Sequence, residues 1–304
     1  YNRSPTLLRN KRSVDADAGV KLRLPYREPF DFDGMLAFLA MRAVPQIESI
    51  VEGAYVRTLQ IDGETGLLNV SQDVENRCLV CKVELTNTRP LMKVVEKVRT
   101  LFDLDADPSE INQCLGENGE LTDLIAENPG QRLPGAWDPF EVAVRAIVGQ
   151  QVSVKGATTV MSRIVDRYGE RIGETVLFPT PESLAALSVE NLSMPNKRAQ
   201  AIKDMAAAVV RSEIDVARSN SSEILIGQMT AIKGIGPWTA QYVTMRALND
   251  PDAFLHSDLV ILKSAASLLG VRSEKEMLKR SQAWRPWRAY AGMHLWRYAA
   301  RLAR

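Results

Sequence analysis

The segment KGIGPWTAQY, Lys233 to Tyr242, combines residue types that suit the binding of an anion. Gly234 and Gly236 permit a positive φ and a close approach of the backbone to a ligand. Pro237 suits the first turn of a helix, whose unpaired N–H groups attract negative charge. With the helical pattern before it, the segment predicts a helix-hairpin-helix that grips a nucleic-acid phosphate without reading base sequence. A glycine-rich helix-helix turn with no ligand fits this short pattern equally well.

Asp258 opens the apolar segment DLVILKSAASLLG. A carboxylate in this place is typical of a helix N-cap, and the pattern alone favours that role. The alternative is a catalytic carboxylate held at a helix start beside a cleft. His256 and His294 are the only histidines, and no dense acidic cluster occurs, which disfavours a histidine metal site or a catalytic triad. Chemistry carried by a single aspartate remains compatible with the sequence.

Aromatic residues and arginines are interleaved in the segment AWRPWRAYAGMHLWRYAARLAR. This pattern suits nucleic-acid bases and phosphates, although a helix whose aromatic side chains fill the core gives the same pattern. Residues 134–304 hold 22 Lys and Arg against 16 Asp and Glu, whereas residues 1–133 hold 16 against 21. The charge of the C-terminal half therefore favours a polyanionic partner, or it belongs to an ordinary solvated surface.

The three cysteines, Cys78, Cys81 and Cys114, are too few and too uneven for a disulfide framework and fit a reducing cytoplasm. Cys78 and Cys81 have CxxC spacing, but RCLVCKVEL alternates like a β-strand. No second pair or neighbouring histidine completes a zinc site, so buried strand cysteines are expected. No run of 18 apolar residues predicts a membrane span, and the N-terminus lacks the apolar core of a signal peptide.

The elements that must position these residues divide into a tail and two domains. Residues 1–22 predict a basic tail or linker, and residues 23–132 predict a small α+β domain with an antiparallel sheet. After the segment LPGAWDP, residues 133–304 predict an all-α domain.

Several local features of these domains are predicted. In the first domain, a helix enters through Asp33 and stops before Pro45, and a hairpin turns at Gly63 and Gly66. RPLMKVVEKVRTLFDL has an apolar face at helical spacing. In the second domain, a break between two helices is predicted near Gly149. Another helix should start at Pro181 with Thr180 as its N-cap.

Five separated motifs resemble one protein family: RLPGAWDPFEVAVRAIVGQQVS, SMPNKRAQAI, IKGIGPWTAQYVTMRA, FLHSDL and WRPWRAYAGMHLW. The family is the AlkA-type 3-methyladenine DNA glycosylase II, within the helix-hairpin-helix DNA glycosylase superfamily. The resemblance extends over residues 23–304. It implies an α+β fold, in which a small antiparallel-sheet domain precedes an all-α helix-hairpin-helix glycosylase domain.

The resemblance also implies a reaction: hydrolysis of the N-glycosidic bond of an alkylated purine, of the 3-methyladenine or 7-methylguanine type, in base excision repair. Asp258 matches the family's essential aspartate, and Trp238, Tyr242 and Trp296 match its aromatic base pocket. The base must be flipped out of the duplex. A cationic alkylated base is attracted to aromatic faces by roughly 0.5–2 kcal/mol each and is already a good leaving group. One carboxylate therefore suffices to stabilise the sugar cation or orient water.

At the hairpin, the resemblance implies a DNA anchor and a cation site. The phosphate-binding hairpin comprises Lys233, Gly234, Ile235 and Gly236. Backbone carbonyls for a structural monovalent cation, Na⁺ or K⁺, would come from Thr230, Ile232 and Ile235. No other cofactor is implied, and since a C-terminal four-cysteine cluster is lacking, no iron–sulfur cluster is expected.

The residue after the hairpin bears on the reaction type. Relatives that also cut the DNA strand carry a lysine in a G-[IV]-G-x-K pattern, and its amine forms a Schiff base with the sugar. This chain has Trp238 at that position. The resemblance therefore implies a monofunctional glycosylase without lyase activity.

Two positions depart from the family pattern. Gln151 stands at the tip after GQ, where the family's best-known member has a leucine that plugs the hole left by the flipped base. A polar wedge can bond to the orphaned base, whereas an apolar wedge unstacks bases differently, so the wedge and the base preference stay open. Ser193 stands where a glycine is common.

The implied partner is double-stranded DNA with alkylated bases, bound by a monomer in the bacterial cytoplasm near the nucleoid. The chain begins with Tyr1, as expected of a processed protein or fragment. Its first residues, YNRSPTLLRNKR, resemble the end of an AraC-type helix-turn-helix domain, as in Ada-like regulators fused to a glycosylase; a disordered basic extension fits equally. Two other functions stay open: a noncatalytic DNA-damage-binding or regulatory module, and a glycosylase for deaminated or oxidised bases.

Overall fold

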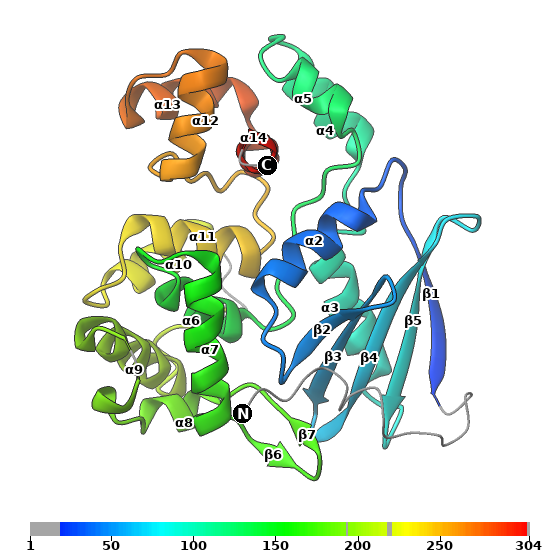
Figure 1. Ribbon diagram of the computed structural model, residues 1–304, viewed down its shortest axis with the longest axis vertical. Coiled ribbons are helices and arrows are strands. Elements are labelled where there is room, and N and C mark those ends of the chain that lie inside the picture. Colours follow the sequence, from blue (N-terminus) through cyan, green and yellow to red (C-terminus); the bar gives the residue numbers. More distant parts are fainter. Residues whose placement is uncertain (1–18, 193, 218–220, 303–304) are drawn as a thin grey trace.

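The computed structural model describes residues 19–192, 194–217 and 221–302. Most of the predicted tail 1–22, together with Ser193, lies outside these residues. The chain forms an antiparallel sheet beside groups of helices (Figure 1). None of the helices in the described ranges combines the length and the apolar character that a bilayer span requires.

The N-terminal domain is built on one antiparallel sheet in the order β1-β5-β4-β3-β2. Its strands are β1 (Val20–Pro25), β2 (Glu48–Val51), β3 (Ala54–Ile61), β4 (Glu64–Asp73) and β5 (Cys78–Leu85). The predicted hairpin joins β3 to β4 and turns at Asp62 and Gly63, with φ of 52° and 81°. Gly66 does not belong to the turn, so that prediction was wrong. It lies within β4, where a Cβ would come within 1.8 Å of the Glu84 carbonyl oxygen.

Two helices, α2 (Phe32–Arg42) and α3 (Leu91–Phe102), supply apolar residues to the same core as the sheet. Val94, Val98 and Leu101 of α3 are buried at helical spacing, as predicted. The predicted entry of α2 through Asp33 was wrong. Asp31 is the N-cap and accepts a hydrogen bond from the Gly34 N–H at 2.9 Å, while Asp33 lies in the first turn.

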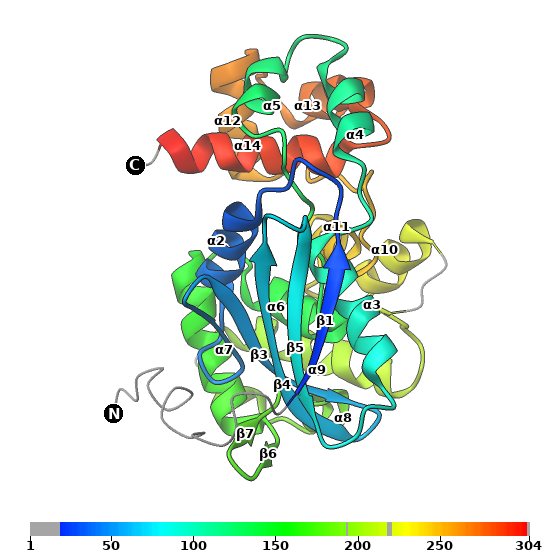
Figure 2. The ribbon, with the colours of Figure 1, turned by 90° about the vertical axis from the view of Figure 1, so that its right-hand side faces the viewer.

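Two helices of the N-terminal half lie beside the C-terminal helices. They are α4 (Pro108–Gly116) and α5 (Thr122–Glu127), and they contact η2 (Ser281–Trp284) and α14 (Arg288–Leu302), respectively. Figure 2 shows α4 and α5 grouped with α12, α13 and α14 at one end of the molecule. This group, the upper lobe, is therefore built from two segments far apart in the sequence.

The remaining elements run from α6 to α13. They are α6 (Pro139–Val148), α7 (Val154–Tyr168), β6 (Arg171–Ile172), β7 (Thr175–Val176), α8 (Pro181–Ala185), η1 (Val189–Asn191), α9 (Asn196–Val210), α10 (Ser222–Thr230), α11 (Pro237–Ala247), α12 (Leu259–Leu269) and α13 (Glu274–Arg280). The break near Gly149 and the Thr180 cap occur as predicted. The two-stranded ladder of β6 and β7 was not predicted in an all-α domain. Gly173, with φ of 59°, provides the turn between these strands.

The apolar residues form two clusters, and α11 contributes to both. Met245 belongs to the cluster that contains the sheet and the upper lobe, and Val243 belongs to the cluster of α6, α7, α9 and α10. Helix α11 therefore lies between the two clusters, and Tyr242 packs against both of them, while Trp238 packs against the first.

Candidate active site

Asp258 is the N-cap of α12, as its place before an apolar helix predicts. Its Oδ1 accepts hydrogen bonds from the backbone N–H groups of Val260 and Ile261, at 3.0 and 2.9 Å. The carboxylate also receives two indole N–H groups at 3.0 Å: Trp238 donates to Oδ2 and Trp296 donates to Oδ1. Capping a helix and standing among aromatic residues are therefore compatible for this side chain.

Three aromatic residues from two helices surround this carboxylate. Trp238 and Tyr242, on successive turns of α11, stack with ring centroids 5.5 Å apart and ring planes 10° apart. Trp296 of α14 lies 6.3 Å from Tyr242, at an angle of 54°. All three are only partly buried and line one cleft. The structure thus brings together the four residues that the sequence analysis assigned to catalysis and base binding.

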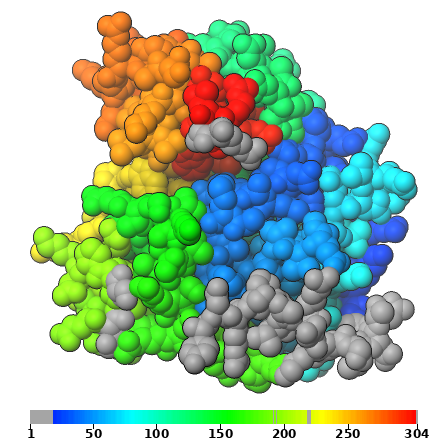
Figure 3. All heavy atoms as spheres, in the orientation of Figure 1, coloured from blue at the N-terminus to red at the C-terminus, as the bar shows by residue number. Residues whose placement is uncertain are grey.

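The cleft has a volume of about 2120 Å³, and α2, α6, α11, α12 and α14 contribute to its walls. In Figure 3, the surfaces of α2 (blue), α6 and α7 (green) and the upper lobe (orange to red) meet on the face toward the viewer. Small-molecule pockets usually measure roughly 300–1,000 Å³. A cleft of this size suits part of a larger ligand.

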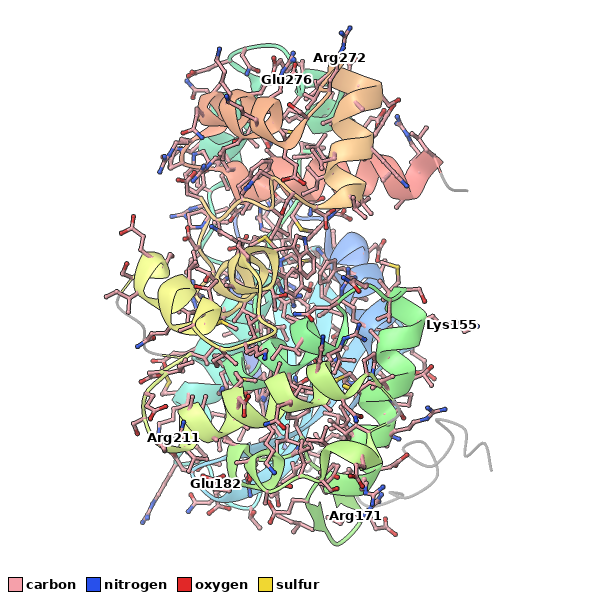
Figure 4. The ribbon with its side chains drawn as sticks, turned by 90° about the vertical axis from the view of Figure 1, so that its left-hand side faces the viewer. Lys155, Arg171, Glu182, Arg211, Arg272 and Glu276 are labelled. Carbon is pink, nitrogen blue, oxygen red and sulfur yellow. The ribbon has the colours of Figure 1, made fainter. Side chains whose placement is uncertain are left out.

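The rim of the cleft carries exposed apolar side chains, and lysines next to residues of its lining carry unpaired positive charge. The large exposed apolar side chains on it are Met41, Val152, Val154, Leu259 and Val260. Lys155 projects from the first turn of α7 into solvent (Figure 4). Among the described residues, neither Lys155 nor Lys233 has an ion-pair partner. Apolar groups gathered in this way mark an interaction surface, and free lysines suit an anionic partner.

Two arginines act on the Tyr242 phenol at the inner end of the cleft. Arg246 Nη1 donates to Tyr242 Oη at 2.8 Å, and Arg42 lies 3.7 Å over the Phe38 ring. Burial raises the pKa of the Tyr242 hydroxyl, but the charges of Arg246 and Arg42 outweigh burial, so that the pKa is lower than its ordinary value. The hydrogen bond from Arg246 therefore holds the Tyr242 ring in place at the inner end of the cleft.

A buried ion cluster closes this end of the cleft. Glu141 of α6 accepts hydrogen bonds from Arg57 of β3 at 3.1 Å and from Arg145 at 2.6 Å, and Arg145 also donates to Glu48 at 2.7 Å. Burial raises the pKa of the Glu141 carboxyl, but the two guanidinium groups outweigh burial and lower the pKa to about 2. These groups are charged and mutually paired, so they tie the sheet to α6 and stiffen the cleft wall.

The hairpin between α10 and α11 has the backbone geometry of an anion site. Gly234 has a φ of 97°, and the Ile235 N–H donates to the Ile232 carbonyl at 3.0 Å. Ile235 is buried, whereas Lys233 and Gly234 are exposed. The Gly236 N-cap has no side chain, so no side-chain acceptor satisfies the N–H groups at the start of α11. These groups are available to an anion.

The carbonyl groups expected to hold a monovalent cation take part in few hydrogen bonds. The Ile232 carbonyl accepts the Ile235 N–H, which leaves it a second lone pair. In the part of the chain that the structure describes, no hydrogen bond uses the carbonyls of Thr230 and Ile235. Each of the three carbonyl oxygens therefore keeps at least one lone pair that a cation could use.

Gln151 lies at the edge of the cleft, in the turn between α6 and α7. It is exposed and has a φ of 55°, in the left-handed region that few non-glycine residues occupy. The tip residue predicted from the GQ motif is therefore presented toward solvent at the mouth of the cleft.

The CxxC cysteines do not form a metal site. Cys78 and Cys81 are buried in β5, three positions apart, so their side chains point to opposite faces of the sheet. Burial raises the pKa of the Cys81 thiol to about 12. Among the described residues, no group of three or more His, Cys, Asp and Glu side chains could hold a metal.

Sequence patterns did not identify the arginines at the Tyr242 hydroxyl or the buried ion cluster around Glu141. One signal was usable: Arg246 follows Tyr242 by four residues, the spacing at which helical side chains meet. No local pattern connects Arg57 with Glu141, which are separated by 84 positions.

Two family models match the chain: the AlkA N-terminal domain over residues 21–138, and the HhH-GPD superfamily base excision DNA repair protein over residues 144–289. DNA-3-methyladenine glycosylase 2 of Escherichia coli (strain K12) is 33% identical over 279 residues, which cover 90% of this chain and 95% of that protein. A Mycobacterium tuberculosis (strain ATCC 25618 / H37Rv) protein, "Probable bifunctional transcriptional activator/DNA repair enzyme AlkA", is 39% identical over 306 residues. They cover 96% of this chain, and the chain spans 61% of that protein's length.

Among solved structures, the 3-methyladenine DNA-glycosylase from Archaeoglobus fulgidus has a TM-score of 0.80 at 21% identity. The match covers 92% of this chain and 98% of that one. At this identity, the likeness shows a shared fold. The family matches and the identity to the Escherichia coli protein show more: the chain belongs to the HhH-GPD superfamily of base excision DNA repair proteins and carries the AlkA N-terminal domain.

Proposed function

We propose that the chain is a monofunctional DNA glycosylase that hydrolyses the N-glycosidic bond of alkylated purines, of the 3-methyladenine and 7-methylguanine type, in base excision repair. One observation carries the proposal: the Asp258 carboxylate is held by Trp238 and Trp296 within an aromatic cleft. The names of the relatives support it, since the Escherichia coli protein is called DNA-3-methyladenine glycosylase 2.

The aromatic group binds the flipped base. Trp238, Tyr242 and Trp296 offer partly exposed π-faces, which attract a cationic base more strongly than a neutral one. Arg246 donates a hydrogen bond to the Tyr242 hydroxyl and so fixes the orientation of that ring. Preference for a charged, alkylated base over a normal base follows from this electrostatic difference.

Asp258 stabilises the positive charge that develops on the sugar. The glycosidic C–N bond breaks with its electron pair leaving on the base, which neutralises a cationic purine without an acid. Water then adds to the sugar cation, and its proton passes to the solvent. Oδ1 already accepts three hydrogen bonds, whereas Oδ2 accepts one, from Trp238. Oδ2 therefore keeps free lone pairs and is the oxygen that faces the sugar or the attacking water.

The chain acts without a lyase step. Trp238 occupies the position at which a strand-cleaving relative places its nucleophilic lysine, and its N–H is bonded to Asp258. The expected product is an abasic site in an intact strand.

Duplex DNA with alkylated bases is the partner, bound by a monomer in the bacterial cytoplasm at the nucleoid. The hairpin Lys233–Gly236 holds a backbone phosphate, and a sodium or potassium ion on the carbonyls of Thr230, Ile232 and Ile235 would hold the hairpin in shape and add positive charge at that phosphate. The bifunctional name of the Mycobacterium tuberculosis relative supports a further proposal, that this chain is the repair part of a longer regulatory protein.

The test is base release from a panel of duplexes that carry alkylated, deaminated or oxidised bases, with Asp258→Asn as control. Asparagine caps a helix as well as aspartate does, so the fold should persist. We expect release of alkylated purines by the wild type and a loss of at least about a hundredfold in the variant. Equal release by both proteins would disprove the role of Asp258. DNA binding without base release from any lesion would indicate a noncatalytic module. Release of deaminated or oxidised bases alone would show that these, and not alkylated purines, are the substrates.

A further inference from the structure

The tip of the loop between α6 and α7 has a backbone conformation that its residue type does not favour. Gln151 adopts a φ of 55°, and its neighbour Val152 is also exposed. The left-handed region is unfavourable for a non-glycine residue, so contacts elsewhere must maintain it. On the C-terminal side, the loop is fixed by Ser153, which caps α7 through the Gly156 N–H at 3.1 Å.

On the N-terminal side, the loop is fixed by Gln150. Its Nε2 donates to the Gly234 carbonyl at 3.0 Å and to Thr239 Oγ1 at 2.9 Å. Because a carbonyl oxygen can only accept, the amide orientation is determined by Gly234, and both amide protons are used. Thr239 lies in α11 and is 2% exposed, so it is a rigid partner.

Helix α9 also lies close to Gly234. A Cβ on it would lie 3.2 Å from the Ala201 Cβ of α9, which shows how closely α9 approaches the hairpin. The loop is therefore bonded to the hairpin through Gln150, at a point where α9 leaves little room for a side chain on Gly234.

We propose that Gln150 is a positioning residue that fixes the tip Gln151 relative to the phosphate-binding hairpin. The inference rests on the proposed function, in which the hairpin holds a backbone phosphate, and it takes for the tip the wedge role that the family resemblance implies. Both actions work on one DNA strand, so the spacing between hairpin and tip sets how far the base is pushed. Without the Gln150 amide, the hairpin still binds phosphate, but the tip is no longer held at the distance from the hairpin that insertion requires.

The experiment measures base unstacking without any reaction. A duplex carries a tetrahydrofuran abasic analogue with 2-aminopurine beside it, and the fluorescence increase at saturating protein reports unstacking. Gln150→Met keeps the length of the side chain and removes the amide. Gln228→Met is the matched control. Gln228 lies on α10, its amide also donates to a backbone carbonyl, that of Glu213 at 3.0 Å, and it does not line the cleft.

We expect Gln150→Met to lower the unstacking equilibrium constant by about tenfold, while affinity for undamaged duplex changes less than about twofold and the melting temperature is kept. Gln151→Ala should give a similar loss, and the double variant should lose no more than either single variant, because both act through the tip. The proposal would be overturned if Gln150→Met unstacked the duplex as well as the wild type does, or if the wild type unstacked nothing. It would also be overturned if the losses of the two single variants added in the double variant, or if affinity for undamaged duplex fell as much as unstacking. A wild type that unstacks DNA but releases no base would contradict the glycosylase function alone.

Discussion

At the scale of single residues, Asp258 is controlled by the N–H groups around it. Two of these are backbone donors that fix the carboxylate to α12, and two are indole donors from α11 and α14. The tryptophans therefore have two separable roles: their faces can bind a base, and their N–H groups aim and stabilise the carboxylate.

Trp238→Phe separates these roles, because it keeps an aromatic face and removes the hydrogen bond to Oδ2. We expect the single-turnover rate of base release to fall about tenfold with little change in DNA affinity. Trp287→Phe is the control, since Trp287 contacts Tyr290 at 5.8 Å and does not line the cleft. Equal rates for both variants would show that the indole N–H has no part in the reaction.

Two buried titratable residues should make opposite contributions to stability. His294 is 1% exposed, its ring nitrogens have no partner among the described residues, and burial, together with the charge of Arg297, lowers its pKa to about 4. Burial raises the pKa of Asp103 to about 6, although its Oδ2 accepts hydrogen bonds from the Leu133 N–H and the Tyr290 hydroxyl. Each shift of two to three units corresponds to about 3 kcal/mol.

The sign of each contribution follows from the state that binds the proton more tightly. As the pH falls from about 6.5 to 4, the unfolded chain protonates His294 first, and stability is lost. As the pH falls from about 6 to 4, the folded protein protonates Asp103 first, and stability is gained. Relative to the wild type, Asp103→Asn should therefore lose stability over this window and His294→Leu should gain it. Guanidinium unfolding at a series of pH values measures both, and parallel profiles for the three proteins would contradict the assignment.

At the scale of elements, the hairpin depends on a backbone conformation that only glycine adopts without strain. Gly234→Ala adds a Cβ at a φ of 97° and presses it against Ala201. We expect a loss of about 1–2 kcal/mol in the free energy of unfolding and weaker binding of DNA. Gly227→Ala is the control, because a Cβ there meets nothing within 4 Å inside α10, and it should stabilise by up to about 1 kcal/mol. Chemical denaturation and binding of undamaged duplex test both variants.

Local patterns predicted most elements, because their causes are local. The apolar face of α3, the Thr180 cap and the β3–β4 pairing each depend on residues close in the sequence. The wrong details have distant causes. Asp31 rather than Asp33 caps α2, and Asp31 also pairs with Arg297 of α14 at 2.5 Å. Gly66 is required by the carbonyl of β5 beside it, which no pattern within β4 reveals.

The candidate site was predictable for a different reason. Asp258, Trp238, Tyr242 and Trp296 were identified by resemblance of several motifs, and their meeting required three helices to converge. Physical reading of the sequence alone left Asp258 as a cap. The bond from Gln150 to Gly234 and the bond from Arg57 to Glu141 each join residues 84 positions apart, so only the fold reveals them.

At the scale of the whole molecule, the net charge of +1 conceals a basic half that suits DNA. Each lysine that neutralises a phosphate should contribute about 0.9 to the slope of log affinity against log salt. Lys233→Ala should therefore lower the slope by about 1 for any DNA sequence, as should Lys155→Ala. Lys82→Ala, on the exposed side of β5, should leave the slope unchanged, and a change equal to that of Lys233→Ala would mean that binding is not localised at the cleft.

The upper lobe has a practical consequence. Its α4 and α5 come from the segment that the AlkA N-terminal domain matches. Its α12 and α13 lie within the HhH-GPD match, and most of α14 follows that match. Cutting the chain between 138 and 144, where the two matches meet, would give fragments that each expose half of one apolar core. The border between the two family matches is therefore not a boundary between independently folding parts. The two halves should be soluble and active only when they are produced together.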